Sequence, residues 1–144
     1  MLESINEQTL RAYRVTHARV SAMLDRMTDE QLQWRPAPHA LPAAFHIWHI
    51  ARWADYFAAA VPGMTPILGE RLRPGVQIWE AEGLAATWGW PVETLGFSAT
   101  GMQMDEALAA RLVFPAKTVL AAYVSRAFAA AELAIDAIDV EQFD

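Results

Sequence analysis

The chain has 144 residues, a formal net charge of −6 and a hydrophobic content of 54%. This length suits one domain, and the apolar content is enough for a buried core and excludes an intrinsically disordered chain. The acidic balance argues against a nucleic-acid partner, because phosphate binding needs a cationic surface.

The sequence contains no cysteine. Disulfides, thiolate metal sites and a cysteine nucleophile are therefore excluded, and any thiol chemistry needs an exogenous thiol. The first residues have neither the basic nor the apolar region of a signal peptide. The longest stretch without formal charge, residues 36–51, is shorter than a membrane span and is interrupted by prolines and histidines. We expect a soluble, cytoplasmic protein without a membrane partner.

Two long helices are predicted in the first half of the chain. The first spans residues 2–27, where one helical face carries residues three and four apart, namely Ile5, Thr9, Tyr13, Thr16, Val20, Met23 and Met27. Thr28 and Gln31 then form a capping box. The second helix runs from about Leu41 to about Ala60, with Pro42 in its first turn. Its bulky apolar residues point in nearly every direction, so we expect it to be largely buried.

Residues 61–114 form one long connection broken by prolines and glycines. Short helices are expected at residues 77–88 and 105–112, and no alternation typical of strands occurs. A connection of this length suits a crossover between helices that run in the same direction. A last long helix is predicted from Pro115 to Asp139, with abundant alanine for close packing. The fold class is all-α, in one domain of residues 1–144.

Residues 24–32 resemble residues 135–143, with the shared pattern apolar, Asp, any, apolar, cap, any, Glu, Gln, apolar. Nine positions can match by chance, or they mark a true repeat. In a true repeat, a further helix follows the second copy as one follows the first. Three amphipathic helices alone leave an apolar face open. We therefore expect that a fourth helix is absent from this chain, or that a partner subunit replaces it in a homodimer.

Chemistry-bearing residues gather in the second predicted helix. The phosphate-loop, dinucleotide, nucleophile-elbow and His-Glu-x-x-His signatures do not occur. His46 and His49 are three residues apart, so both imidazoles can face one groove. In apolar surroundings a neutral imidazole is favoured, and this form binds zinc, nickel or iron. The alternative is that both histidines only form hydrogen bonds in a core, since two histidines do not complete a ligand shell.

Arg52 and Asp55 follow on the same helix. Arg52 could hold an anionic substrate, and Asp55 could bind substrate as an acid or base or orient a histidine. The alternatives are a solvated arginine at the helix edge and a surface acid. His17 could approach the same site from the first helix, whereas His39 lies in a proline-bounded loop and should be exposed. No catalytic residue is assigned.

The crossover is rich in tryptophan. The tryptophans and acidic residues of the crossover could cover one side of a pocket, or the tryptophans could only pack in the core. These residues are Trp79, Glu80, Glu82, Trp88 and Trp90.

The segment from Phe45 to Asp55 resembles the second-helix motif of the DinB/YfiT-like superfamily, and residues 28–36 resemble the end of that family's first helix. The resemblance implies an up-down-down-up four-helix bundle. It also implies a divalent metal bound by three side chains. One of these is His49 by its position in the motif, and the other two form a His/Glu-x-x-x-His pair in the fourth helix. No histidine follows His49 here, so that pair is absent.

The resemblance further implies a metal-dependent enzyme, either a thiol-dependent S-transferase or an isomerase acting on a small molecule. The expected cofactors are a divalent metal (Zn, Ni or Fe) and a low-molecular-weight thiol whose pKa the metal lowers. The alternative is a metal-free helical module for dimerisation or small-molecule binding without catalysis. A DNA-repair role, which the family name suggests, is disfavoured by the negative charge.

Overall fold

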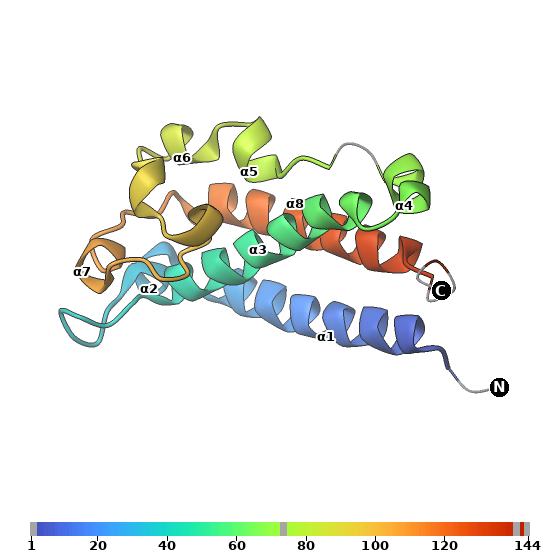
Figure 1. The fold of residues 1–144 in the computed structure, drawn as a ribbon. Helices are drawn as coiled ribbons and strands as arrows, with labels where there is room; N and C mark the ends of the chain where they lie inside the picture. The colour runs from blue at the N-terminus through green and yellow to red at the C-terminus, as the bar shows by residue number, and fades with distance from the viewer. Residues whose placement is uncertain (1–2, 73–74, 140–141, 143–144) are drawn as a thin grey trace.

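The computed structural model describes residues 3–72, 75–139 and 142. These residues form helices and no strand, as the sequence predicts. Three of the helices are long, namely α1 (Ile5–Arg26), α3 (Ala43–Ala60) and α8 (Lys117–Ala137). α8 packs against both α1 and α3 and is the central helix of the three. Figure 1 shows that α3 and α8 run in the same direction and α1 in the opposite one, so the predicted crossover topology is confirmed.

Both ends of α1 are defined by capping residues. Ser4 and Glu7 form a capping box at its start. At its end, the predicted capping box of Thr28 and Gln31 is present and opens the short helix α2 (Asp29–Gln33). The side chain of Thr28 accepts a hydrogen bond from the backbone of Gln31 at 3.1 Å. The first helix therefore ends where its sequence predicts.

The buried face of α1 differs from the predicted one. Its buried residues are Leu10, His17, Val20 and Leu24. By contrast, Ile5 is 72% exposed and Met23 is 43% exposed, although both belong to the predicted inner stripe. α1 packs on α8, so the residues that face α8 are covered and the stripe beside them stays open. The stripe predicted from periodicity is therefore rotated about the helix axis relative to the face that is buried.

α3 is buried on most of its surface, as predicted, and Pro42 is its N-cap rather than a residue of its first turn. The side chains of Ile47 and Trp48 are fully covered. Exposed positions are few, and they include His46 and Ile50.

The crossover contains several short helices: η1 (Val61–Gly63), α4 (Pro66–Arg71), α5 (Ile78–Ala81), α6 (Leu84–Thr87), η2 (Val92–Thr94), η3 (Phe97–Ala99) and α7 (Glu106–Ala109). The single helix predicted at residues 77–88 is wrong, because Gly83 adopts φ +57° and separates α5 from α6. The helix predicted at residues 105–112 shortens to α7. α8 begins at Lys117, two positions later than predicted.

The crossover tryptophans fill the core between the crossover and the long helices. Trp79 is 2% exposed and Trp90 is 5% exposed. Their rings form a cluster with Trp48 of α3 and Tyr123 of α8, with centroid distances of 5.2 Å for Trp48–Trp90 and 5.5 Å for Trp79–Tyr123. Such aromatic contacts add to the large apolar area that each ring buries. The structure therefore favours the core-filling alternative for these tryptophans.

α8 is long and apolar enough to cross a membrane by length and composition, with a mean hydropathy of 1.4. Its central position between α1 and α3 accounts for this composition in the described fold. The second copy of the capping pattern, at residues 135–143, lies partly outside the described residues.

Close packing of α8 can be tested at its alanines. Ala127 is fully buried, so we expect Ala127→Leu to overpack the core and lower the free energy of unfolding by about 1–3 kcal/mol in urea denaturation. Ala129→Leu is the matched control, because Ala129 is exposed on the same helix. Equal stability of the two variants would contradict the central position of α8.

Candidate functional site: a pocket between α1 and α3

A pocket of about 640 Å³ lies between α1 and α3. Its walls are mainly apolar and aromatic, and two imidazoles interrupt them. The lining residues are Ala12, Tyr13, Thr16 and His17 from α1, and His49, Ile50, Trp53, Ala54 and Phe57 from α3. The rings of Tyr13 and Phe57, 6.3 Å apart, link the two helices. An apolar pocket with a few convergent polar groups is the usual form of a small-molecule site.

His49 is the imidazole that α3 contributes to this pocket. Its Nδ1 lies 2.5 Å from the carbonyl oxygen of Thr100. A carbonyl can only accept a hydrogen bond, so Nδ1 carries the proton and donates it. The neutral ring then has its lone pair on Nε2. The ring also stacks on Phe45, with centroids 5.9 Å apart.

His17 is the imidazole that α1 contributes. It is 6% exposed, and it stacks on Phe128 of α8 with ring centroids 3.9 Å apart. Its Nδ1 lies 2.8 Å from Oε1 of Glu132. The carboxylate accepts this hydrogen bond, so His17 also has its lone pair on Nε2 when neutral. Histidines that bind metals almost always donate their other ring N–H to a carboxylate or carbonyl in this way.

His46 does not share the pocket with His49, although their spacing predicts one groove. The pocket begins at His49 along α3, whereas His46 lies nearer the start of the helix and is exposed to solvent. The edge of its ring contacts Phe45, at 5.8 Å between centroids. His39 is exposed in its loop, as predicted.

The pocket fits part of a metal site. His49 and His17 both line it, and imidazole nitrogen has the right chemistry for zinc, nickel or iron. Among residues 3–72, 75–139 and 142, no group of three or more His, Cys, Asp or Glu side chains is placed to hold one ion. Catalytic zinc sites in proteins use three protein ligands, so the described side chains provide an incomplete set.

Arg52 and Asp55 lie inside the protein rather than at its surface, with exposures of 0% and 2%. The alternatives of a solvated arginine and a surface acid are therefore wrong. Each of the five N–H groups of Arg52 has an acceptor: Ala99 O at 2.9 Å, Asp55 Oδ2 at 3.1 Å, Tyr123 Oη at 3.1 Å, Gln77 Oε1 at 2.6 Å and Ser98 O at 2.9 Å. No donor of Arg52 remains for a substrate, so this geometry gives the predicted substrate-binding role no support.

Asp55 accepts hydrogen bonds from the backbone N–H groups of Ile78 and Trp79, at 2.8 and 2.9 Å. It also accepts the hydroxyl of Tyr123 at 2.9 Å. Burial raises the pKa of Tyr123 well above its usual value, so this phenol stays protonated and keeps donating. Within the described residues the hydrogen bonds of Asp55 go to Arg52, to the start of α5 and to Tyr123 of α8, and none goes to a histidine.

Arg52 and Asp55 thus form a buried network that attaches the crossover to α3 and α8. One part of the crossover held in this way is the segment from Gly96 to Gly101, called the 96–101 turn below. Ser98 and Ala99 adopt φ values of 47° and 53° in this turn, which non-glycine residues rarely do. Sequence reasoning missed the turn, and its one signal was the pair of glycines at its ends.

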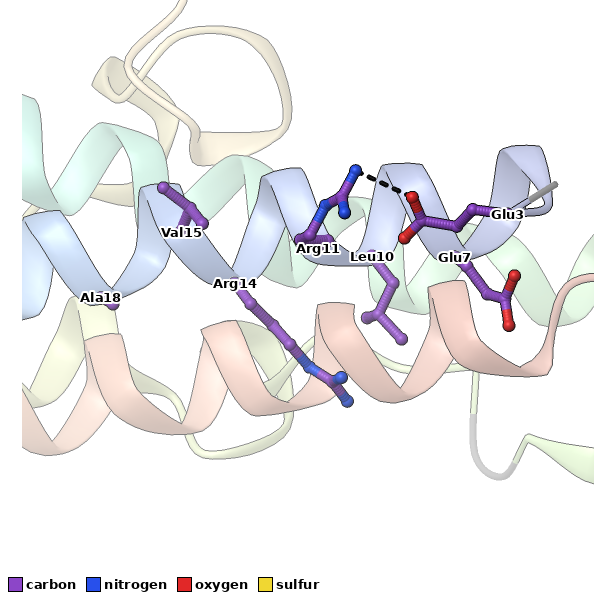
Figure 2. Close-up of a pocket in the computed structure, with 7 residues that line it drawn as sticks. All are labelled: Glu3, Glu7, Leu10, Arg11, Arg14, Val15 and Ala18. Carbon is purple, nitrogen blue, oxygen red and sulfur yellow. Dashed lines mark ion pairs between the residues drawn. The ribbon is translucent and has the colours of Figure 1, made fainter. Parts of the chain in front are cut away.

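A second hollow, of about 780 Å³, runs along the first half of α1. Figure 2 shows its lining, in which Arg11 reaches toward Glu3 with a nitrogen–oxygen distance of 2.8 Å. Its charged side chains are largely solvated, and it contains no histidine. The pocket between α1 and α3 is therefore the better candidate site.

The sequence profile of the DinB superfamily matches residues 12–144, nearly the whole chain. The chain belongs to the DinB superfamily. This membership agrees with the helical fold and with the resemblance carried by the second helix. A search among curated proteins finds no match. Since one fold supports many chemistries, DinB membership alone fixes neither an activity nor a metal.

The buried network predicts a large stability effect at Asp55. Asp55→Asn leaves the Arg52 charge uncompensated inside the protein, and we expect the free energy of unfolding to fall by about 3–5 kcal/mol. Glu82→Gln removes the acid of the exposed Arg126–Glu82 pair, whose N–O distance is 2.7 Å, and should have a much smaller effect. Equal effects in chemical denaturation would show that the buried network does not hold the crossover.

Proposed function

We propose that this DinB-superfamily protein binds a divalent metal in the pocket between α1 and α3, and that it uses the metal in a thiol-dependent transfer or isomerisation of a small molecule. The observation that carries the proposal is His49, which lines the pocket while its Nδ1–H is bound to the Thr100 carbonyl. This arrangement leaves Nε2 as the ligand atom.

In this proposal His49 and His17 are the two nitrogen ligands from the described chain, and His17 takes the place predicted for His46. Glu132 orients His17 by accepting its Nδ1–H at 2.8 Å. The chemistry that a bound metal supplies is a lowered pKa for a coordinated exogenous thiol, which makes the nucleophilic thiolate available near neutral pH.

The aromatic walls of the pocket have a separate part in this proposal. Tyr13, Trp53 and Phe57 surround the imidazoles with apolar surface. They would bind the apolar portion of a small electrophilic substrate and keep water from the thiolate.

A metal-free module that binds a small molecule or a second copy is the second candidate. Two observations favour it: among the described residues no group of three or more potential metal ligands is placed to hold one ion, and the pocket walls are mainly apolar. Ile50 and Tyr13 at the pocket are 38% and 37% exposed, which gives an apolar partner a surface to cover.

Metal content separates the two candidates. Purified protein is incubated with Zn²⁺ or Ni²⁺, desalted and measured by elemental analysis. We expect about one metal per chain in the wild type, loss of metal in His49→Ala and weaker retention in His17→Ala. His46→Ala is the matched control, because this histidine on the same helix is exposed and lies outside the pocket; it should retain the metal.

Protein that retains no metal would contradict the metalloenzyme proposal and leave the metal-free module. Equal loss of metal in His46→Ala would show that the ion binds elsewhere. Metal-loaded protein that fails to accelerate addition of any of several low-molecular-weight thiols to small electrophiles would contradict the transferase part while leaving metal binding intact.

A further inference from the structure

We propose that Arg52 is a positioning residue for His49. Acting through the 96–101 turn, it fixes the His49 tautomer with the proton on Nδ1 and so keeps the lone pair on Nε2. The importance of this tautomer for chemistry rests on the function proposed above. The tautomer itself is a property of the metal-free protein and can be tested without any metal.

The guanidinium of Arg52 is fully occupied by partners within the fold. It is fully buried on α3, one turn after His49, and all five of its N–H groups are used. Asp55 balances its charge at 3.1 Å. Two of the five hydrogen bonds go to consecutive backbone carbonyls of the 96–101 turn, those of Ser98 and Ala99, at 2.9 Å each. The buried guanidinium of Arg52 thus holds, by hydrogen bonds, the backbone of the two residues directly before Thr100.

The turn needs these hydrogen bonds because its backbone is strained at Ser98 and Ala99, which have positive φ values. Each left-handed non-glycine residue costs free energy, and such residues persist only where the surroundings hold them. Bonds within the turn contribute, as the N–H of Gly101 donates to the Leu95 carbonyl at 2.8 Å. The carbonyls of Ser98 and Ala99, however, are held from outside, by Arg52. The consequence is a fixed direction for the next carbonyl, that of Thr100.

The Thr100 carbonyl meets Nδ1 of His49, and this contact selects the tautomer. An imidazole without a partner at Nδ1 favours the proton on Nε2, so a fixed acceptor at Nδ1 reverses the preference. Close approach is possible because residue 101 is glycine. A Cβ there would lie 3.2 Å from His49 Nδ1 and 2.8 Å from the Trp48 ring.

The test measures the tautomer of His49 directly. If Arg52 had only a structural role, a folded Arg52 variant would keep the same tautomer. Protein labelled with ¹⁵N-histidine is examined without metal, at a pH where the imidazoles are neutral, by long-range ¹H–¹⁵N correlation spectra. In the wild type we expect Nδ1–H for His49. In Arg52→Lys, which keeps the charge but loses the fork of donors, we expect the Nε2–H form to become the larger population.

Arg126→Lys is the matched control. Arg126 makes a two-point ion pair with Glu82 of the same crossover, with both N–O distances at 2.7 Å, and among the described residues no hydrogen bond or ion pair joins it to the 96–101 turn. This variant should leave the His49 tautomer unchanged. A folded Arg52→Lys with His49 still in the Nδ1–H form would overturn the proposal.

If Arg52→Lys does not fold, Tyr123→Phe decides the question, since it removes one acceptor of Arg52 and loosens the guanidinium without deleting it. We then expect a measurable Nε2–H population, and its absence would overturn the proposal. A separate measurement bears on function: metal affinity in the Arg52 variant should fall roughly 10- to 100-fold. A changed tautomer in a protein that binds no metal would support the positioning role while contradicting the proposed function.

Discussion

The buried ion pair between Arg52 and Asp55 is the interaction on which the rest of this structure depends. Its partners come from α3, α8, the start of α5 and the 96–101 turn, so four separate segments meet at one pair of charges. Removing two charges from water is costly, and the pair is tolerable only because each group is fully hydrogen-bonded. The network therefore gives a crossover that has little regular structure one definite position on the bundle.

The three long helices could be predicted from sequence because their signals are local. Periodicity gave their extent, and the Thr28–Gln31 capping box gave one boundary. The buried face of α1 could not be predicted in the same way. The predicted stripe and the buried one lie side by side on this helix and share Val20, and only the position of α8 decides which residues are covered.

The candidate site was predictable only in part, because its contacts join residues distant in sequence. Arg52 meets Tyr123 and Gln77, which are 71 and 25 residues away. No pattern near Arg52 shows these partners, so the sequence suggested only a substrate-binding arginine or a solvated one, and not a buried structural one. His46 and His49 share a helical face, yet only tertiary packing determines where along α3 the pocket begins. The pairing of His17 with Glu132, 115 residues apart, is likewise a property of the fold.

The two walls of the pocket differ in how firmly they are built. The α3 wall is fixed from behind by the Arg52–Asp55 network, whereas α1 is joined to α8 by packing and by the hydrogen bond between His17 and Glu132 at 2.8 Å. A shift of α1 away from α8 would break this hydrogen bond, in which the imidazole is buried. The width of the pocket therefore depends on this one hydrogen bond as well as on packing. The two imidazoles are thus each held by a partner outside the lining of the pocket, His49 by the Thr100 carbonyl and His17 by Glu132, so both have defined positions in it.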